Sequence, residues 1–236
     1  MSRVGSNHRY GTWKGLPEAS SQPLIRPTQM IAHSIVGSAR SAYNYFRDGT
    51  SLESHWIFPW DGAAWQLMES NRRADANYRA NRWPNGTGAL SAETEDNRDP
   101  DNQPWTEPQV DRLIDWFRWG NAMFAIPLRL CPGPAEPGIG YHTLWPNHWS
   151  KYAGKTCPGR VRIEQFHDLI LPALTQPKEN DMEPRAFVKA GFLAALGRYP
   201  HDETEMANHL AFLAFHGQEG FLDNLETSDE SKAHRA

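Results

Sequence analysis

The sequence has little cysteine and no long apolar run. Its two cysteines, Cys131 and Cys157, are too few for a disulfide framework, so free thiols or a metal ligand are at least as well supported as one bridge. No apolar run approaches the ~18 residues that a membrane-spanning helix needs, so we expect no membrane insertion. The amino-terminal residues are polar and lack the apolar stretch of a secretory signal peptide, which favours a protein made in the cytoplasm.

The sequence also lacks an excess of positive charge. The formal net charge is −4, and residues 176–236 hold six lysines and arginines against eleven aspartates and glutamates, so the acidity lies in the tail. Nucleic-acid binding needs a basic surface that neutralises phosphates. We therefore expect no nucleic-acid partner.

Short apolar stretches rich in aromatic and β-branched residues, bounded by glycine, proline or asparagine, predict strands. They lie at residues 29–36, 54–60, 63–68 and 87–94. The Asp61–Gly62 pair predicts a hairpin turn between the second and third of them. A helix is predicted over residues 106–124, starting at a capping box of Thr106 and Gln109, and another over 161–171, stopped by Pro172. This mixture predicts an α/β fold with a central mixed sheet flanked by helices.

The chain is expected to divide into a main domain and a small helical one. Residues 1–24 are interpreted as an amino-terminal extension, 25–175 as the main domain and 176–184 as a linker, because that segment is polar and contains proline. Residues 185–236 form the small domain, with two or three short amphipathic helices over residues 187–198, 203–217 and 220–231. A unit of about fifty residues is marginal alone, so we expect it to dock on the main domain or a partner.

A histidine- and cysteine-bearing loop over residues 138–159 raises the question of a metal site. Zinc accepts histidine nitrogen and cysteine sulfur, and catalytic zinc sites use three protein ligands. Cys157 with His142 or His148, and His33 from the first predicted strand, would supply such a set. From spacing alone, a hydrogen-bonded core histidine at position 33 and an inert buried thiol at position 157 remain open.

The order of the motifs narrows these alternatives. HSIVGS at residues 33–38, SHWIFPWDGAAWQL at 54–67, GALSAETE at 88–95, the long helix, and GYHT followed by KTCPG at 155–159 succeed one another. In this order they resemble the N-acetylmuramoyl-L-alanine amidase family, the zinc amidase fold shared with peptidoglycan recognition proteins and many phage endolysins. The resemblance covers roughly residues 25–173.

This resemblance implies a role for five residues. The zinc ligands fall on His33, His142 and Cys157, the catalytic acidic residue on Glu93, and the lysine near the metal-binding cysteine on Lys155. Zinc would activate a water, Glu93 would accept its proton and pass it to the leaving amine, and Lys155 would stabilise the oxyanion.

Some of these assignments have alternatives in the sequence. His148 could replace His142 as a ligand, and Glu95 or Asp96 could be confused with Glu93. Many family members have a tyrosine where this chain has Ser54, which puts any role of that tyrosine in doubt here. The histidine that follows, His55, is expected to be structural.

Aromatic and amide side chains near the loop are candidates for substrate contact. They are Trp145, Trp149, Asn77 and Asn81. The tail resembles a small helical domain of bacterial surface proteins, which implies either a wall-targeting module or a cap on the main domain.

The sequence therefore predicts a peptidoglycan hydrolase that cleaves the amide between N-acetylmuramic acid and L-alanine with a zinc-activated water. Without a signal peptide, a phage endolysin that waits in the host cytoplasm for a membrane lesion is expected. The alternatives are a non-catalytic peptidoglycan-binding protein of this fold, a cytoplasmic wall-recycling amidase, and a cysteine hydrolase using Cys157 with His142.

Overall fold

The computed structural model describes residues 10–49, 53–175, 184–196, 198–229 and 232–233, and it divides into two compact units. The larger unit spans residues 1–176 and the smaller one residues 177–236. Most of the linker expected at residues 176–184 lies outside the described residues. Among the described residues, no helix is both long enough and apolar enough to cross a bilayer.

A six-stranded mixed sheet forms the centre of the larger unit, in the order β1-β4-β3-β5-β2-β6. Its strands are β1 (Thr12–Trp13), β2 (Arg26–Ser34), β3 (Trp56–Phe58), β4 (Trp65–Gln66), β5 (Thr87–Thr94) and β6 (Gly138–Tyr141). Strands β3, β5, β2 and β6 run parallel, whereas β4 is antiparallel to β3. The expected mixed sheet is confirmed, but β1 was missed, since it lies in the segment interpreted as an extension and pairs with β4.

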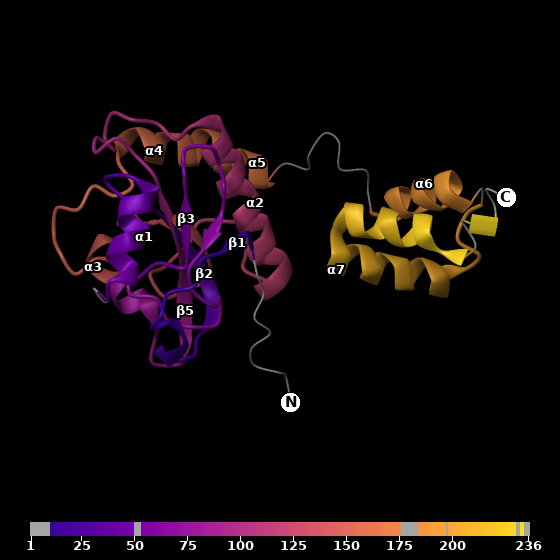
Figure 1. Ribbon diagram of the computed structural model, residues 1–236, viewed down its shortest axis with the longest axis horizontal. Helices are drawn as coiled ribbons and strands as arrows, with labels where there is room; N and C mark the ends of the chain where they lie inside the picture. Colours follow the sequence, from indigo (N-terminus) through magenta and orange to yellow (C-terminus); the bar gives the residue numbers. More distant parts are fainter. Residues whose placement is uncertain (1–9, 50–52, 176–183, 197, 230–231, 234–236) are drawn as a thin grey trace. The chain divides into compact units, whose positions relative to one another are not determined.

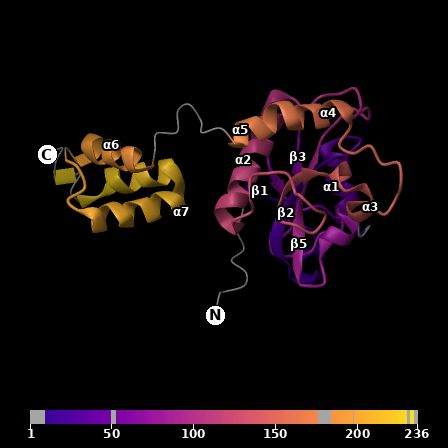
Figure 2. The same cartoon turned by 180° about the vertical axis from the view of Figure 1, so that it is seen from behind.

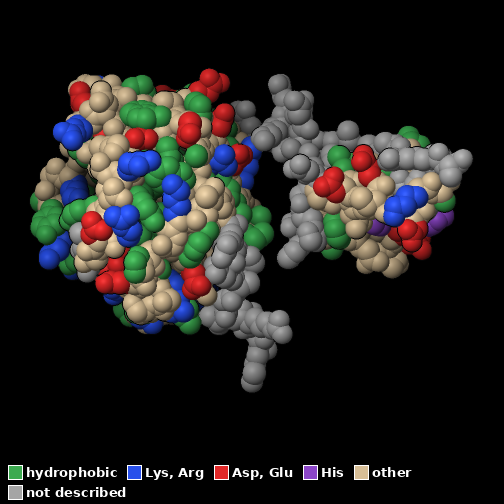
Figure 3. All heavy atoms as spheres, viewed as in Figure 1, with side chains coloured by type: hydrophobic (Ala, Val, Ile, Leu, Met, Phe, Trp, Pro, Cys, Tyr) green, Lys and Arg blue, Asp and Glu red, His purple; other side chains and the backbone are tan. Residues whose placement is uncertain are grey.

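Helices cover both faces of this sheet. They are α1 (Ala39–Arg47), α2 (Glu107–Phe124), α3 (Pro146–Trp149), α4 (Arg160–Gln165) and α5 (Leu171–Thr175), with short 3₁₀ turns at Ala19–Ser21 (η1), Tyr78–Asn81 (η2) and His142–Leu144 (η3). Helices α1 and α3 lie on one side and α2 on the other, and the view from behind shows the same division (Figures 1 and 2). On the face seen in Figure 3, acidic and basic side chains of this unit are interspersed.

The side-chain alternation of the strands decides which residues meet which helices. Met30 and Leu90 pack in one buried cluster with residues of α2, whereas Ile31 and Ala89 pack in another with Trp149 of α3. Because every second residue of a strand faces the same side, His33 shares the side of Ile31, and Glu93 shares the side of Ala89. Both therefore lie on the α3 side of the sheet. Ser34 and Thr94 lie on the α2 side.

The predicted turn and helix start are both present. Gly62 has a φ of +73°, and its N–H donates to the carbonyl of Pro59 at 3.0 Å, which closes the turn between β3 and β4. Thr106 caps α2, and Gln109 completes the capping box by accepting from the Thr106 N–H.

The sequence predicts that Pro172 ends the helix after the cysteine loop, but the helix continues past this proline. Helix α4 passes through a π-helical segment, Phe166–Ile170 (η4), into α5, which ends at Thr175. Proline in a helix removes one N–H and crowds the preceding turn. The wider π turn immediately before α5 accommodates both effects.

In the described part of the smaller unit, the main elements are the helices α6 (Pro184–Leu196) and α7 (Glu203–Thr227). Asp202 caps α7 by accepting from the Glu205 N–H, and Val188, Phe192 and Phe221 are part of the buried core of this unit. Of the two or three helices expected here, the second and third segments form one, because α7 continues through Gly217 and Gly220. Glycine lowers helix propensity by only about 1 kcal/mol, and packing against α6 outweighs it.

His55 is a structural residue, as expected. It is fully buried, its Nδ1 accepts from the Ser91 N–H at 3.1 Å, and its Nε2 donates to the carbonyl of Arg72 at 2.8 Å. Both ring nitrogens are therefore used by a neutral imidazole. Burial lowers the pKa of His55 to about 4.

This buried histidine predicts sensitivity to mild acid. Between the unfolded pKa of about 6.5 and the folded pKa of about 4, the unfolded chain binds a proton that the folded chain does not, so stability falls as pH falls through this window. From pH 7 to pH 5, His55 alone lowers the free energy of unfolding by about 2 kcal/mol. Urea denaturation of the wild type and His55→Gln at both pH values, with chelator present, measures this difference. Equal pH dependence in the two proteins would contradict it.

Candidate metal centre

The parallel strands bring the predicted site residues to one edge of the sheet. In the β2–β5 ladder His33 lies opposite Glu93, and in the β2–β6 ladder Ala32 lies opposite Tyr141. His142 follows Tyr141, so it comes beside His33, with ring centroids 4.3 Å apart. Parallel strands end at the same edge, which explains how residues far apart in sequence meet here.

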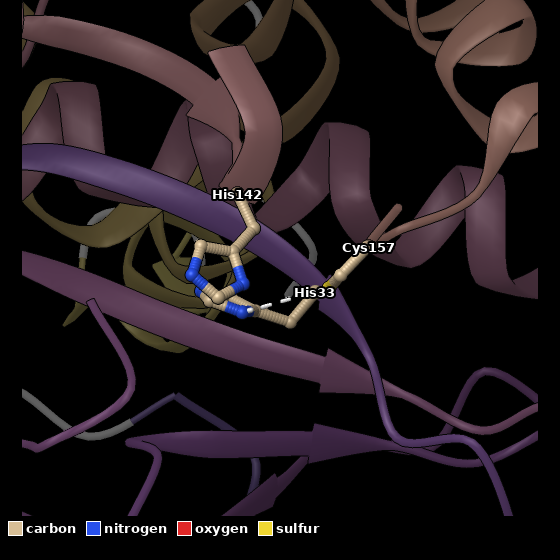
Figure 4. Close-up of side chains that lie close together, drawn as sticks. All are labelled: His33, His142 and Cys157. Carbon is tan, nitrogen blue, oxygen red and sulfur yellow. Dashed lines mark hydrogen bonds between the residues drawn. The ribbon is translucent and has the colours of Figure 1, made fainter. Parts of the chain in front are cut away.

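Cys157 reaches this edge from the loop that precedes α4. Its Sγ accepts from the Ser34 N–H at 3.2 Å and lies 3.8 Å from Nδ1 of His33 (Figure 4). Two residues later Gly159 has a φ of +107°, and a Cβ there would overlap the carbonyl of Pro100. Glycine at this position therefore lets the loop turn tightly between Cys157 and α4.

The three side chains fit a zinc ion. One donor atom each from His33, His142 and Cys157 lies within 4.8 Å of the other two. Nε2 of His33 contacts Oδ1 of Asn77 at 2.7 Å, and Nε2 of His142 contacts the carbonyl of Trp149 at 2.8 Å. Because both acceptors require a proton on Nε2, the Nδ1 lone pairs are left for a metal. Two imidazoles and one thiolate are donors that zinc prefers.

The electrostatics of the histidines suit metal binding. Burial, reinforced by the neighbouring His142, lowers the pKa of His33 well below its usual value, and burial lowers that of His142 to about 4. Both imidazoles are therefore neutral at neutral pH, which is the form that binds metals. Burial, together with the nearby Glu93, raises the pKa of Cys157 to about 12 in the metal-free protein.

Glu93 is the acidic side chain that faces this group. Its Oε1 lies 3.9 Å from Nδ1 of His33, and burial raises its pKa to about 7, opposed by the charge of Lys155. The neighbouring carboxylates are engaged elsewhere. Glu95 accepts from the N–H groups of Ala39 and Trp60.

Asp96 is likewise engaged by other groups. It accepts from the backbone N–H groups of Val36 and Arg98 and from the hydroxyl of Ser34. Of the three acids that the sequence left open, Glu93 is therefore the one whose carboxylate lies beside His33.

Lys155 and His148 take different positions. Lys155 is exposed, yet its charge acts on Glu93 and on both histidines, so it lies near the group. His148 lies on α3 and is not part of the ligand group found among the described residues. His142, which directly follows β6, is thus the histidine that lies beside His33.

Two of the four expected substrate contacts are buried, and the other two are half-buried. Trp149 and Asn77 are fully buried, so neither presents a surface to substrate. Trp149 donates its Nε1–H to the carbonyl of Pro134, and Oδ1 of Asn81 accepts from the Asn77 N–H. Trp145 is half-buried and donates its Nε1–H to the carbonyl of Cys131.

Sequence reasoning missed that Asn77 and the Trp149 carbonyl orient the two histidines. A backbone acceptor carries no sequence signal. The polar residues of the ADANYRAN segment drew attention to Asn77, but its distance from His33 in the chain hid the contact.

Comparison with known proteins finds similarity at the level of the fold. No protein-family model matches the sequence, and no curated protein matches it. Among solved structures, PlyL aligns with a TM-score of 0.52 and 16% identity over 71% of this chain and 98% of its own. The chain therefore shares the fold of PlyL.

Two further solved structures align with this chain at lower scores. N-acetylmuramoyl-L-alanine amidase LysC from Clostridium intestinale has a TM-score of 0.47 and 13% identity over 66% of this chain and 94% of its own. Drosophila peptidoglycan recognition protein SA has a TM-score of 0.43 and 9% identity over 68% and 93%. The six-stranded mixed sheet with its flanking helices, together with the alignment to PlyL, confirms the α/β fold expected from the sequence.

Proposed function

We propose that this protein is a zinc-dependent peptidoglycan amidase that cleaves the bond between N-acetylmuramic acid and L-alanine. The observation that carries the proposal is the convergence of His33, His142 and Cys157, with the Glu93 carboxylate 3.9 Å from His33. The choice of peptidoglycan as substrate rests on the motif resemblance, and the fold shared with PlyL is consistent with the architecture that this resemblance implies.

The residues divide the chemistry among them. A zinc ion held by His33, His142 and Cys157 would polarise the scissile carbonyl and lower the pKa of a water. Glu93 accepts a proton from the attacking water and returns it to the leaving amine, and a carboxyl with a pKa of about 7 is suited to both steps. Lys155 places positive charge near the oxyanion that forms on the attacked carbonyl.

The setting of this activity is proposed from the sequence. We assign catalysis to residues 25–175, with β1 of the preceding segment completing the sheet edge. The protein acts on the bacterial wall as an endolysin that leaves the host cytoplasm through a membrane lesion, and the smaller unit serves as a wall-targeting or docking module. Trp145, which is half-buried beside the site, is the remaining aromatic contact for substrate.

The alternatives fit the geometry less well. A cysteine hydrolase needs a thiolate activated by a lowered pKa, whereas burial raises the pKa of Cys157 to about 12. A non-catalytic binding protein of this fold needs a surface that contacts peptidoglycan. It does not require three converging ligands beside a carboxylate with a raised pKa.

The proposal is tested by product chemistry and metal removal. Purified wild type is incubated with peptidoglycan, with and without chelator, and the soluble products are analysed by mass spectrometry. We expect free L-alanine amino termini on stem peptides, their loss with chelator, and recovery on adding zinc. Activity that persists in chelator but is abolished by thiol alkylation would favour the cysteine hydrolase, and tight binding without release of peptides would favour the binding protein.

A further inference from the structure

Arg162 is a buried cation behind the metal centre for which the proposed chemistry gives no role. The side chain is fully buried, although it stands in α4 only five residues after Cys157. A buried guanidinium is costly unless its donors are satisfied. Burial lowers the pKa of Arg162 to about 10, so the side chain remains charged at neutral pH.

The guanidinium makes four hydrogen bonds, all to neutral groups. Nε donates to the carbonyl of Gln103 at 2.9 Å, and Nη2 to the carbonyl of Glu95 at 3.1 Å. Nη1 donates to two hydroxyls, Ser34 Oγ at 3.2 Å and Thr94 Oγ1 at 2.9 Å. The planar fork of arginine can reach four acceptors at fixed angles, which the ammonium of lysine cannot reproduce.

These bonds tie together the carboxyl ends of β2 and β5. Ser34 provides the N–H that donates to Cys157 Sγ, and its own Oγ is held between Arg162 and Asp96. Thr94 Oγ1 accepts from Arg162 and donates to the carbonyl of His33 at 2.6 Å. Hydrogen bonds therefore link Arg162 to Cys157 through Ser34 and to His33 through Thr94, so a single residue stands between Arg162 and each of these two ligands.

Its position also separates it from the reacting groups. Ser34 and Thr94 lie on the α2 side of the sheet, whereas His33 and Glu93 lie on the α3 side. The hydrogen bonds of Arg162 reach the ligands through Ser34 and Thr94, and its charge also acts on Cys157.

We propose that Arg162 is a positioning residue of the metal centre: its four-bond fork fixes Ser34 and Thr94, and thereby the placement of Cys157 and His33 for zinc. This inference rests on the proposed zinc site. Loss of residues that orient metal ligands typically lowers metal affinity about 10–100-fold.

The test compares zinc affinity across matched full-length variants, by competition with a chromogenic chelator. Arg162→Met and Arg162→Lys are expected to weaken zinc binding about tenfold or more. The control is Arg112→Met, which removes a half-buried guanidinium that donates to the Gly62 carbonyl and Tyr10 hydroxyl, away from the site. The control is expected to lose thermal stability while its zinc affinity stays within about twofold.

A second variant keeps the inference testable if Arg162 variants do not fold. Thr94→Val retains the shape of the side chain but removes the hydroxyl that links Arg162 to His33. We expect weaker zinc binding and, in the cobalt-substituted protein, a shifted ligand-field spectrum, which a loss of stability alone would not cause. Wild-type affinity in Arg162→Lys or in Thr94→Val would overturn the positioning role while leaving the zinc site intact. Absence of zinc binding in the wild type would overturn both.

Discussion

Replacing Cys157 with alanine is expected to abolish both zinc binding and wall hydrolysis. Cys157 is the one thiolate donor of the ligand group, and two neutral histidines remain without it. Loss of the metal removes several kcal/mol of stabilisation from the charged transition state, which corresponds to a fall of about 10³-fold or more in kcat/KM. Elemental analysis of the purified protein, with peptidoglycan digestion assayed on the same samples, measures both effects.

Cys131→Ala provides the matched control for this variant. Cys131 is also buried, but its neighbour is the Gln29 amide, with Nε2 3.7 Å from Sγ, and it is not part of the ligand group. We expect this control to keep a zinc-to-protein ratio near that of the wild type and to remain active. A Cys157→Ala protein that still binds zinc and digests the wall would refute the ligand assignment.

Much of the site could be predicted because it lies on regular elements. The alternation of β2 and β5 places His33 and Glu93 on one face, and the parallel pairing places them opposite each other. His142 follows β6 directly. Once the motifs indicated the order of these strands, the geometry of a parallel sheet was sufficient to bring the residues together.

The parts that the sequence did not reveal depend on contacts across the fold. Strand β1 has only two residues and exists through pairing with β4. Asn77 and Trp149 look like substrate contacts in the sequence, yet both are buried, and the Asn77 amide and the Trp149 backbone carbonyl contact the histidines instead. A polar or aromatic residue in a loop-like segment does not show by itself whether it will contact ligand or support the residue that does.

Local rules also failed where packing overrides propensity. Pro172 predicted a helix end, but the π turn before it lets the helix continue to Thr175. In the smaller unit, two segments separated by glycines form the single helix α7, which packs against α6. In each case the local preference amounts to a few kcal/mol at most, less than the burial of several apolar side chains contributes.

Glu93→Gln is expected to separate metal binding from catalysis. The amide keeps the size of the side chain and can still form hydrogen bonds, but it cannot accept a proton from water. Because Glu93 is not one of the three donors, zinc content should remain near that of the wild type. Loss of general base and acid catalysis lowers kcat by about 10²–10⁴-fold. Zinc content and initial rates of peptide release, measured on one preparation, provide the test.

The neighbouring glutamate supplies the control that makes this result specific. Glu95 accepts from the Ala39 and Trp60 N–H groups, so Glu95→Gln weakens two structural hydrogen bonds without touching the ligand group. It should lower thermal stability and leave kcat within about threefold, since hydrogen bonds to charged groups contribute about 1.5–3 kcal/mol to folding rather than to the reaction. If Glu95→Gln lost activity as completely as Glu93→Gln with zinc retained, the loss would reflect distortion of the β5 end. If Glu93→Gln stayed fully active, the proton would have to pass through a different group.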